Sequence, residues 1–552
     1  METQRAFAAV ILSLMILLGY QYFFMPPPPQ PQEPPAGAEQ TQVEPVASPP
    51  AGVAPQTSTP VGAPVAQVAV NQEGTLTGKD ITVETGLYSA VISENGAVVK
   101  SFRLKQYKEH LGKDAQPKEL MFPDTRAAAF AWGNGVPAQL PQYQATQYRV
   151  ATAAGQTASL SLVATPMPGL TVTRKMTFAD NSYQIAIEET VRNESGQALQ
   201  GAPFFTSTNR PFSGGAAAAR GVFTGPALFL DGALQEVKVA DLKGDAAKAL
   251  SGQVDWAAYE DSYFLSAVIP RSTGKSTVLL TPGADEHVTS TISGEQEVLP
   301  SGSEKLYAYT IFLGPKKLSI LKEVGSNLEK VINFGWFDLL AKPTLFLLNF
   351  LHRYLHNYGV AIILVTVFFK LLFWPISHKG MKSMKTMQKI QPKMAKLREK
   401  YKDDHERLNQ EMMTLYKTYK VNPLGGCLPM ILQIPVFFAL YKVLLQTIEL
   451  RHAPFMLWIN DLSAPDRLPI GIDIPGLGGI PVLTLLMGAS MFLQQKMTPT
   501  TGDPAQAKVM MFLPVIFTFM FLNFASGLVL YWFINNLLSV GQQYFINRSV
   551  EP

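Results

Sequence analysis

Hydrophobic residues near the start of the chain form one long run. Residues 6–25 are almost continuously apolar, and such a run crosses roughly 30 Å of hydrocarbon at about 1.5 Å per helical residue. The alternative is a cleaved signal peptide. However, the run ends in Tyr22-Phe-Phe-Met25 and four prolines, which lack the small residues of a cleavage site. We therefore predict a transmembrane signal anchor over residues 1–25.

Two regions with different patterns follow the anchor. Residues 26–74 are rich in proline, alanine and glutamine, which predicts a linker that does not fold by itself. From residue 75 to residue 314, apolar and polar residues alternate, as in Leu170-Thr-Val-Thr-Arg-Lys-Met-Thr-Phe178. Turn clusters such as Glu94-Asn-Gly96 separate the alternating runs. This pattern predicts a large antiparallel β domain of the sandwich type.

Helical spacing of apolar residues begins at residue 315. Residues 315–356 combine leucine and phenylalanine with Lys342, His352 and Arg353, which predicts amphipathic helices, one of them lying in a membrane interface. Five apolar runs follow. With the first anchor they predict a polytopic α-helical membrane domain of six transmembrane helices, and the five later spans cover residues 357–376, 423–446, 480–496, 509–523 and 527–545.

Basic residues gather between the second and third predicted spans. Residues 377–422 hold twelve lysines and arginines, whereas the loop over 447–479 holds only Arg451 and Arg467. Because positively charged loops stay in the cytoplasm, we predict that residues 377–422, the loop over 497–508 and both termini are cytoplasmic, with the β domain outside. Apolar spacing predicts that residues 377–422 form a helical hairpin. Its methionines either pack the two helices together or offer a soft surface to partners, and both interpretations stay open.

Composition excludes several classes of protein. The chain of 552 residues is 47% hydrophobic and only 16% charged, against about 25% charged residues in ordinary soluble proteins. The single cysteine, Cys427, excludes an intrachain disulfide and a cysteine-based metal cluster. Gly274-Lys-Ser-Thr lacks the earlier glycine of a phosphate-binding loop, and His352 and His356 lack the glutamate of a zinc-peptidase motif. We predict no catalytic residue, no metal and no cofactor.

Polar residues inside the predicted spans indicate a hydrophilic groove. Lys370 lies in the second span, where a charge at mid-bilayer costs about 2.5–3.5 kcal/mol, and Thr366 lies one turn earlier. The fifth span is short, so it thins the bilayer or stays part-way across it. A groove with one positive charge, open to the cytoplasm, would lower the barrier that a polar chain segment meets. The alternatives are that Lys370 reaches the cytoplasmic surface and that the polar groups pair between helices. The other polar residues are Gln433, Gln494, Gln495, Asn535, Asn536 and Ser539.

Six ordered motifs carry a resemblance to a known family. They are Asn422-Pro-Leu-Gly-Gly-Cys-Leu-Pro429, Gln433-Ile-Pro-Val-Phe437, Glu449-Leu-Arg451, Phe455-Met-Leu-Trp-Ile-Asn-Asp-Leu462, Gln495-Lys-Met-Thr-Pro499 and Phe524-Ala-Ser-Gly-Leu-Val-Leu-Tyr531. Over residues 336–548 the chain resembles the YidC-type membrane protein insertases. Its anchor, linker and β domain resemble the Gram-negative subtype.

The resemblance implies a membrane protein insertase and assembly chaperone of the cell inner membrane, not an enzyme. The β domain would be periplasmic, with a galactose-mutarotase-type super-sandwich fold. The groove would act alone or beside the Sec translocon on nascent membrane proteins. Membrane lipids would be further partners, as would the ribosome, through the hairpin and the loop with Lys496 and Lys508.

The resemblance also assigns the groove. Where the family commonly has arginine this chain has Lys370, which keeps the charge but loses the bidentate fork. The groove residues that the resemblance implies are Lys370, Thr366, Gln433, Phe437, Tyr531 and Trp532, and the polar residues of the spans add Gln495 and Asn535.

Two other classes of function compete with this prediction. A periplasmic sugar-binding or epimerising enzyme is compatible with the β domain, but a fold alone does not establish an activity. A small-solute transporter typically has internal repeats and paired charges in the membrane. The chain shows no repeat and, by its sequence, only one clear buried charge, Lys370.

Overall fold

The computed structural model describes most of the chain after residue 78. The described residues are 79–112, 114–149, 157–212, 222–242, 247–272, 274–284, 286–402, 404–419, 428–471, 478–497 and 504–549. The predicted anchor over residues 1–25 and most of the region between it and the β domain, including the linker over 26–74, lie outside these residues.

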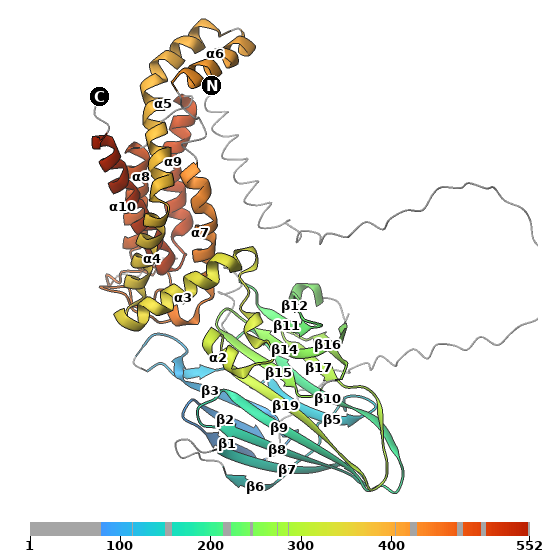
Figure 1. Cartoon of the computed structure of the whole chain (residues 1–552). Coiled ribbons are helices and arrows are strands. Elements are labelled where there is room, and N and C mark those ends of the chain that lie inside the picture. Colours follow the sequence, from blue (N-terminus) through green and yellow to red (C-terminus); the bar gives the residue numbers. More distant parts are fainter. Residues whose placement is uncertain are drawn as a thin grey trace, which may run out of the picture. The chain divides into compact units, whose positions relative to one another are not determined.

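Strands occupy the described residues up to Pro315 and form two antiparallel sheets (Figure 1). The ten-stranded sheet has the order β1-β2-β3-β5-β10-β17-β16-β13, with β4 paired to β3 and β18 paired to β10. Its strands are β1 (Asp80–Glu84), β2 (Tyr88–Ser93), β3 (Val99–Lys108), β4 (Pro117–Glu119), β5 (Arg126–Gly133), β10 (Leu199–Asn209), β13 (Lys248–Gly252), β16 (Ser276–Pro282), β17 (Val288–Ser293) and β18 (Glu297–Leu299).

The nine-stranded sheet has the order β12-β11-β14-β15-β19-β9-β8-β7-β6. A short 3-10 helix, η2 (Val239–Leu242), follows its edge strand β12. The strands are β6 (Gln144–Arg149), β7 (Thr157–Met167), β8 (Leu170–Ala179), β9 (Gln184–Asn193), β11 (Gly225–Leu230), β12 (Ala233–Glu236), β14 (Val254–Glu260), β15 (Phe264–Pro270) and β19 (Glu304–Pro315).

The period-two pattern places one face of each sheet in a shared core. Phe130 and Phe205 from the first sheet belong to the same buried cluster as Leu160, Ile185 and Trp256 from the second. Along a strand, alternate side chains point to the same face, so the apolar positions of each strand face the opposite sheet. The predicted β-sandwich is confirmed, and its likeness to a galactose-mutarotase super-sandwich stays a prediction.

One inward position of β8 carries a charge. Arg174 is fully buried and lies opposite Glu189 of β9, to which its Nε donates a hydrogen bond of 2.6 Å. Its Nη1 donates to the backbone oxygens of Ala97 and Ala128, each at 2.6 Å. The buried guanidinium therefore has partners from both sheets and joins them across the core.

Helices follow the last strand. The first are α2 (Leu318–Val324), two short 3-10 helices, η3 (Leu328–Val331) and η4 (Gly335–Phe337), and the amphipathic helix α3 (Asp338–Leu355). Leu345 and Leu348 of α3 are buried, whereas Leu339, Phe346 and Tyr354 are 85%, 73% and 68% exposed. An apolar face this exposed is typical of a binding or membrane surface, which agrees with the predicted interfacial helix without testing it.

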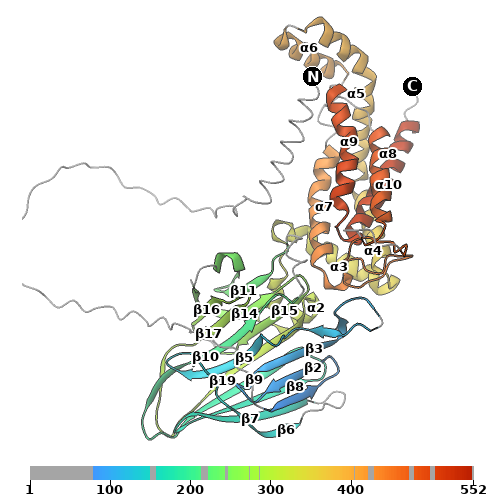
Figure 2. The same cartoon turned by 180° about the vertical axis from the view of Figure 1, so that it is seen from behind.

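The remaining helices form the C-terminal region (Figures 1 and 2). Here α10 packs against α4, α7 and α8. The bounds are α4 (Tyr358–Leu372), α5 (Trp374–Lys400), α6 (His405–Thr418), α7 (Leu428–Gln446), η6 (Ile448–Leu450), α8 (Val482–Met497), α9 (Pro504–Phe521) and α10 (Ser526–Ser549).

Several of these helices differ from their predicted ranges, α4 and α9 among them, and α10 runs four residues beyond the predicted end at residue 545. The apolar run expected over 357–376 ends as a helix at Leu372, because the chain bends by 64° before α5 begins at Trp374. Pro375 lies in the first turn of α5, where proline is tolerated because its missing N–H would have no helical partner. The fifth run, expected over 509–523, extends to Pro504 at its start.

The described helices are short, or too polar, for single membrane spans. In this part of the chain no single helix is long and apolar enough to cross a bilayer, but α4 and α5 together meet that criterion as a bent pair. Gln433–Gln446 and Met510–Phe521 are shorter apolar helices.

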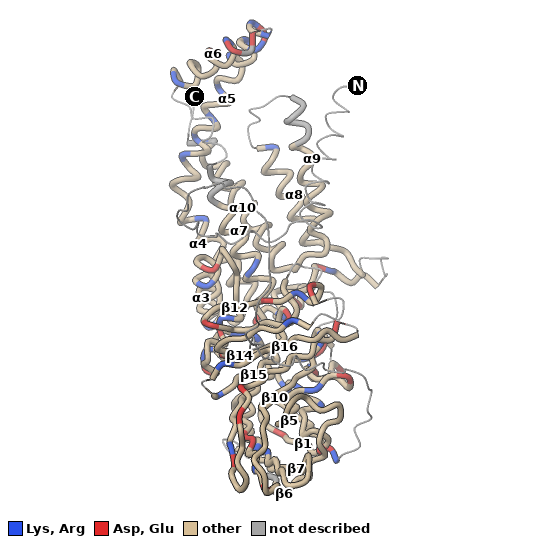
Figure 3. The backbone as a smooth tube through the Cα atoms, turned by 90° about the vertical axis from the view of Figure 1, so that its right-hand side faces the viewer, with Lys and Arg blue, Asp and Glu red and all other residues tan. Residues whose placement is uncertain are grey.

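The helical hairpin predicted over 377–422 is formed by α5 and α6. Met387, Ile390 and Met394 of α5 are buried against Met412 and Leu415 of α6. These methionines therefore pack the two helices together, which was the first of the two interpretations. Figure 3 shows lysine and arginine along both helices.

Candidate functional site

Lys370 lies in the last turn of α4 and points towards α10. Its Nζ donates a hydrogen bond of 2.6 Å to Ser539 Oγ and lies 3.5 Å from Asn535 Oδ1. Ser539 and Asn535 are four residues apart on α10, so they share one face of that helix. Within the described ranges, no aspartate or glutamate forms an ion pair with Lys370. The ammonium is thus held by neutral acceptors and keeps its charge uncompensated.

Thr366 shares a helix face with Lys370 but hydrogen-bonds within its own helix. Its hydroxyl is buried and donates to the backbone oxygen of Ile362 at 2.7 Å. This bond already uses the only hydrogen that the hydroxyl has to donate, so Thr366 can only accept from a further partner.

Four further predicted residues meet between α7 and α10. The side chains of Gln433 and Tyr531 share a hydrogen bond. The ring of Phe437 lies edge-on to Trp532 at a centroid distance of 4.7 Å, and it lies 6.3 Å from the ring of Tyr531. The structure therefore brings Gln433, Phe437, Tyr531 and Trp532 into one cluster.

Two residues of α9 extend this cluster and were not predicted as site residues. The ring centroids of Phe517 and Phe521 lie 5.8 Å and 4.9 Å from that of Trp532. We call Phe437, Phe517, Phe521, Tyr531 and Trp532 the aromatic cluster. The i, i+4 spacing of Phe517 and Phe521 was the available signal, since it places both rings on one helix face.

Gln495, near the end of α8, is half-buried. Among the described residues, no hydrogen bond joins it to another predicted groove residue. Polar contacts between α8 and α10 instead involve Asn536, which donates to Ser490 Oγ at 3.1 Å, and Gln543, which donates to the backbone oxygen of Met497 at 2.6 Å. Ser490 and Gln543 were missed because neither lies in a motif of the predicted groove.

The loop over residues 447–481 fixes the beginnings of α8 and α10. Asp466 is buried, accepts a hydrogen bond of 2.6 Å from Trp458 Nε1 and accepts from the backbone N–H groups of Leu483 and Thr484. Ser526, the first residue of α10, donates to the backbone oxygen of Asp461 at 2.8 Å. The loop therefore holds the two helices in register at their shared end.

Two cavities in the described chain lie away from Lys370. One, of about 510 Å³, lies beside η6, and the other, of about 340 Å³, lies between α5 and α6. A hydrated groove around Lys370 therefore stays a prediction that rests on the hydrogen bonds just described.

Comparison with known proteins gives the family. A family model described as 60Kd inner membrane protein matches residues 350–552, and one described as YidC periplasmic domain matches residues 80–347. The membrane protein insertase YidC of Pelobacter propionicus is 45% identical over 488 residues, which are 86% of this chain and 88% of that protein. The corresponding protein of Geotalea uraniireducens is 40% identical over 99% of both chains.

A solved structure of the same kind also matches. It is described as an active YidC insertase crystal structure with the first transmembrane domain resolved, and it covers 85% of this chain and 92% of its own at 18% identity, with a TM-score of 0.37. The family assignment rests on the sequence relatives, whose identity of 40–45% extends over most of both chains. The chain therefore belongs to the YidC family of membrane protein insertases, which are inner membrane proteins with a periplasmic domain and are not enzymes.

Proposed function

We propose that this chain inserts nascent membrane proteins by passing their short polar segments through a hydrophilic groove and releasing their apolar helices into the bilayer. The observation that carries the proposal is the setting of Lys370, whose ammonium is held by Ser539 and Asn535 and has no carboxylate partner among the described residues. An uncompensated cation at this position is available to an acidic group of a substrate.

The transfer free energies of apolar and acidic residues favour a groove over an energy-driven pump. An apolar helix of 20 residues gains roughly 10 kcal/mol on entering lipid, at about 0.3–0.6 kcal/mol per residue, whereas each acidic group that crosses the centre costs about 3 kcal/mol. Insertion of a lightly charged protein is therefore downhill overall, and the obstacle is a barrier. At an effective dielectric constant near 20, an ammonium attracts a carboxylate about 4 Å away by about 4 kcal/mol, which lowers the barrier and still allows release.

In this proposal the anchor over residues 1–25 and helices α4, α7, α8, α9 and α10 cross the inner membrane. Both termini and the α5–α6 hairpin would be cytoplasmic, and the β domain periplasmic. At about 1.5 Å per residue, the 15 residues of α4 and the 16 of α8 span less than the roughly 30 Å of hydrocarbon. Short helices thin the bilayer around them, and a thinner bilayer shortens the path of a polar segment.

The aromatic cluster supplies the exit. Its rings lie on α7, α9 and α10, near Gln433. Phe437, Phe517 and Trp532 are half-buried and would make the contact, whereas Phe521 and Tyr531 are buried behind them. Large flat side chains offer contact to many apolar sequences at a low cost in side-chain entropy. A transmembrane helix leaving the groove would slide along these rings into lipid.

The partners follow from charge and position. The lysines and arginines of the α5–α6 hairpin would face the cytoplasm, where ribosomal RNA offers phosphates to basic side chains. The Sec translocon would act beside the groove for larger substrates, and membrane lipids would receive the released helices.

Site-specific photocrosslinking tests the proposal. A photoreactive amino acid replaces Gln433 or Trp532, and ribosome-bound nascent chains of a small membrane protein are irradiated in inner-membrane vesicles. Strong crosslinks are expected from both positions. The matched control is Leu537, which is on another face of α10 and is 42% exposed. Crosslinks of equal strength from all three positions would contradict a groove on this surface.

A further inference from the structure

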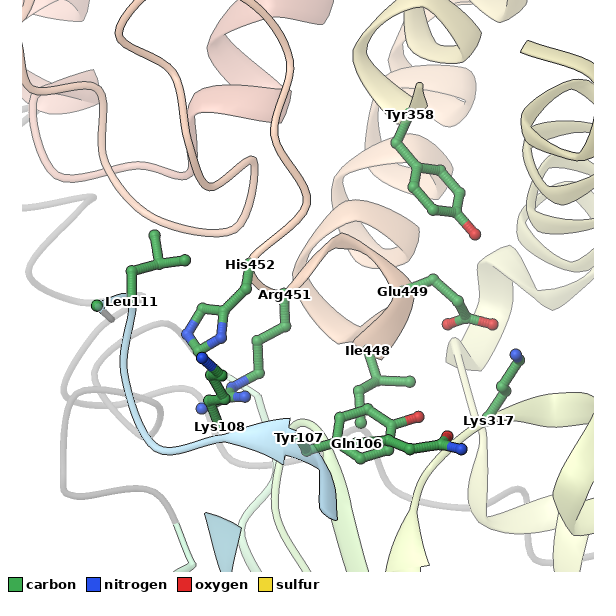
Figure 4. A pocket seen from close by; sticks show the side chains of 11 residues that line it. Gln106, Tyr107, Lys108, Leu111, Lys317, Tyr358, Ile448, Glu449, Arg451 and His452 are labelled. Atoms are coloured by element: carbon green, nitrogen blue, oxygen red, sulfur yellow. The ribbon is translucent and has the colours of Figure 1, made fainter. Parts of the chain in front are cut away.

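A cavity of about 510 Å³ lies between two segments of the chain (Figure 4). One segment is the end of β3 with the residues that follow it, and the other is the segment around η6. Side chains that line it come from four distant parts of the sequence: Lys108, Lys317, Tyr358, and the stretch from Ile448 to His452. The groove residues of the proposed function are not among them, so this cavity is unassigned.

The lining of the cavity is unbalanced in charge. Lys108, Lys317 and Arg451 contribute three cations, and Glu449 is the one acidic side chain among the lining residues. Figure 4 shows Lys108, Arg451 and His452 grouped on one side, and Lys317 with Glu449 on the other. Among the described residues, none of these charged side chains forms an ion pair within 4.0 Å. Cations therefore outnumber acidic side chains in the lining itself, although the carboxylates of Glu109 and Asp461 lie near Arg451. Lys108 and Lys317 supply the remaining positive charge, which suits an anion.

Two of the charged groups are fixed in place. Arg451 Nη2 donates to the backbone oxygen of Glu109 at 2.9 Å, and the guanidinium lies 5.5 Å from the centroid of the Phe264 ring. Glu449 is hydrogen-bonded to Asn349, which accepts a hydrogen bond of 3.1 Å from the Tyr358 hydroxyl. Burial raises the pKa of Glu449, and its hydrogen bond to Asn349 and the nearby Lys317 act in the opposite direction. The part of the site formed by Arg451 is therefore pre-organised and loses little side-chain entropy on binding, whereas Lys108 is exposed and would be ordered by the anion.

The position of the cavity points to a lipid as the source of the anion. Tyr358 is the first residue of α4, and it follows α3, whose exposed apolar face includes Phe346 and Tyr354. Under the proposed function, on which this step rests, α3 lies in the outer interface of the membrane and α4 enters it. The cavity would then lie at the level of the phospholipid headgroups, where phosphodiesters are concentrated. Leu111, which also lines the cavity, is 49% exposed and gives an acyl chain an apolar contact.

We propose that this cavity binds the phosphate headgroup of an anionic phospholipid, with Lys108, Lys317 and Arg451 as the charged contacts. Because the cations outnumber Glu449, the site should prefer a lipid with a net negative charge to a zwitterionic one. A bound headgroup would bridge β3 and the segment around η6, and would thereby tie the β domain to the membrane surface.

The test measures binding of short-chain lipids to the full-length protein in detergent. The three probes are dihexanoyl-phosphatidylglycerol, dihexanoyl-phosphatidylcholine and glycerol 3-phosphate. We expect the phosphatidylglycerol to bind about tenfold more tightly than either of the other two probes. This difference corresponds to one additional charge interaction of about 1.4 kcal/mol. Equal affinities for the two lipids would overturn the proposal. Binding of glycerol 3-phosphate as tight as that of the lipid would overturn the lipid as the source of the phosphate.

Variants separate the site from a general effect on folding. The double variant Lys108→Gln/Lys317→Gln is expected to bind phosphatidylglycerol about tenfold more weakly, whereas Glu449→Gln should bind it more tightly, which misfolding cannot mimic. Lys175→Gln, on an exposed lysine of β8, is the matched control and should bind like the wild type. Unchanged affinity in the double variant, or weaker binding by Glu449→Gln, would refute the site. This experiment measures lipid binding and not insertion. Lys370→Glu should therefore leave the affinity for phosphatidylglycerol unchanged, whether or not the groove mechanism is correct.

Discussion

Lys370 on α4 donates a hydrogen bond of 2.6 Å to the hydroxyl of Ser539 on α10. A hydroxyl fixes the position of an ammonium without neutralising it, whereas a carboxylate would do both. The pairing therefore joins two helices of the C-terminal region, and no carboxylate of the described residues forms an ion pair with Lys370. In the proposed insertase this amine carries the charge that a substrate meets.

Removal of the Ser539 hydroxyl should leave the Lys370 amine less precisely positioned. In Ser539→Ala, Lys370 retains only the longer contact with Asn535, and a hydrogen bond to a charged group is worth about 1.5–3 kcal/mol. Insertion of substrates with acidic periplasmic tails should fall by about threefold or more in reconstituted vesicles, and insertion of neutral-tailed substrates should change little. Ser539→Thr keeps the hydroxyl and serves as the control. A loss of equal size for both substrate classes would argue for a purely structural serine.

Replacement of Lys370 by arginine tests whether charge or shape matters. Arginine keeps the charge and adds a planar fork that can bind a carboxylate through two hydrogen bonds. Lys370→Arg should insert acidic-tailed substrates at least as well as the wild type in the same assay. A strong loss of activity in this variant would show that the pocket formed by Ser539 and Asn535 requires an ammonium.

The buried carboxylate of Asp466 should stabilise the end at which α8 and α10 begin. It accepts hydrogen bonds from Trp458 and from two backbone N–H groups at the start of α8. In Asp466→Ala these donors lose their partner, at a cost of about 1–3 kcal/mol each where they are buried. Thermal unfolding in detergent should show a clearly lower Tm. Asp80→Asn, in an exposed ion pair, should leave the Tm unchanged. An unaltered Tm in the alanine variant would mean that water replaces the carboxylate.

The Arg174–Glu189 pair makes a separate prediction for the β domain. Loss of one partner of a buried ion pair costs about 3–5 kcal/mol, because the other charge remains buried without compensation. Glu189→Gln should therefore make the β domain of the full chain markedly more sensitive to proteases. The double variant Arg174→Met/Glu189→Leu should be less sensitive than the single variant, since it leaves no unpaired charge. A double variant more sensitive than the single one would contradict this account.

Deletion of most of the β domain separates insertion from any function of that domain. If residues 75–310 are removed, insertion by the remaining helices should persist, because Lys370, Gln433 and the aromatic cluster all lie after residue 357. The assay is again insertion into vesicles. Complete loss of insertion, in a deletion variant that still reaches the membrane, would give the β domain a direct part in it.

The sequence predicts the class of each region better than its contacts. Period-two alternation was sufficient for the β-sandwich, and it even places Arg174 at an inward position between Val172 and Met176. Its partner Glu189 could not be predicted, since the pairing depends on the register of two strands. The bend after Leu372 was also missed, because hydropathy continues through it.

The candidate site shows the same limit. Lys370 is conspicuous as a charge in an apolar run, and Ser539 was noted only as one of several polar residues in the last span. The hydrogen bond between them depends on how α4 and α10 rotate about their axes, which packing decides and local sequence does not. The aromatic cluster was predicted in part, from a resemblance, and α9 supplied two more rings.

The central claim is tested most directly by reversing the charge at position 370. Purified Lys370→Glu is reconstituted in vesicles, and insertion is measured for two substrates that differ only in carrying an acidic or a neutral periplasmic tail. Because an attraction of about 4 kcal/mol becomes a repulsion, insertion of the acidic-tailed substrate should fall by at least about tenfold and that of the neutral one by less than about twofold. Lys379→Glu, in the α5–α6 hairpin, is the matched control. Equal insertion of both substrates by Lys370→Glu would contradict the account.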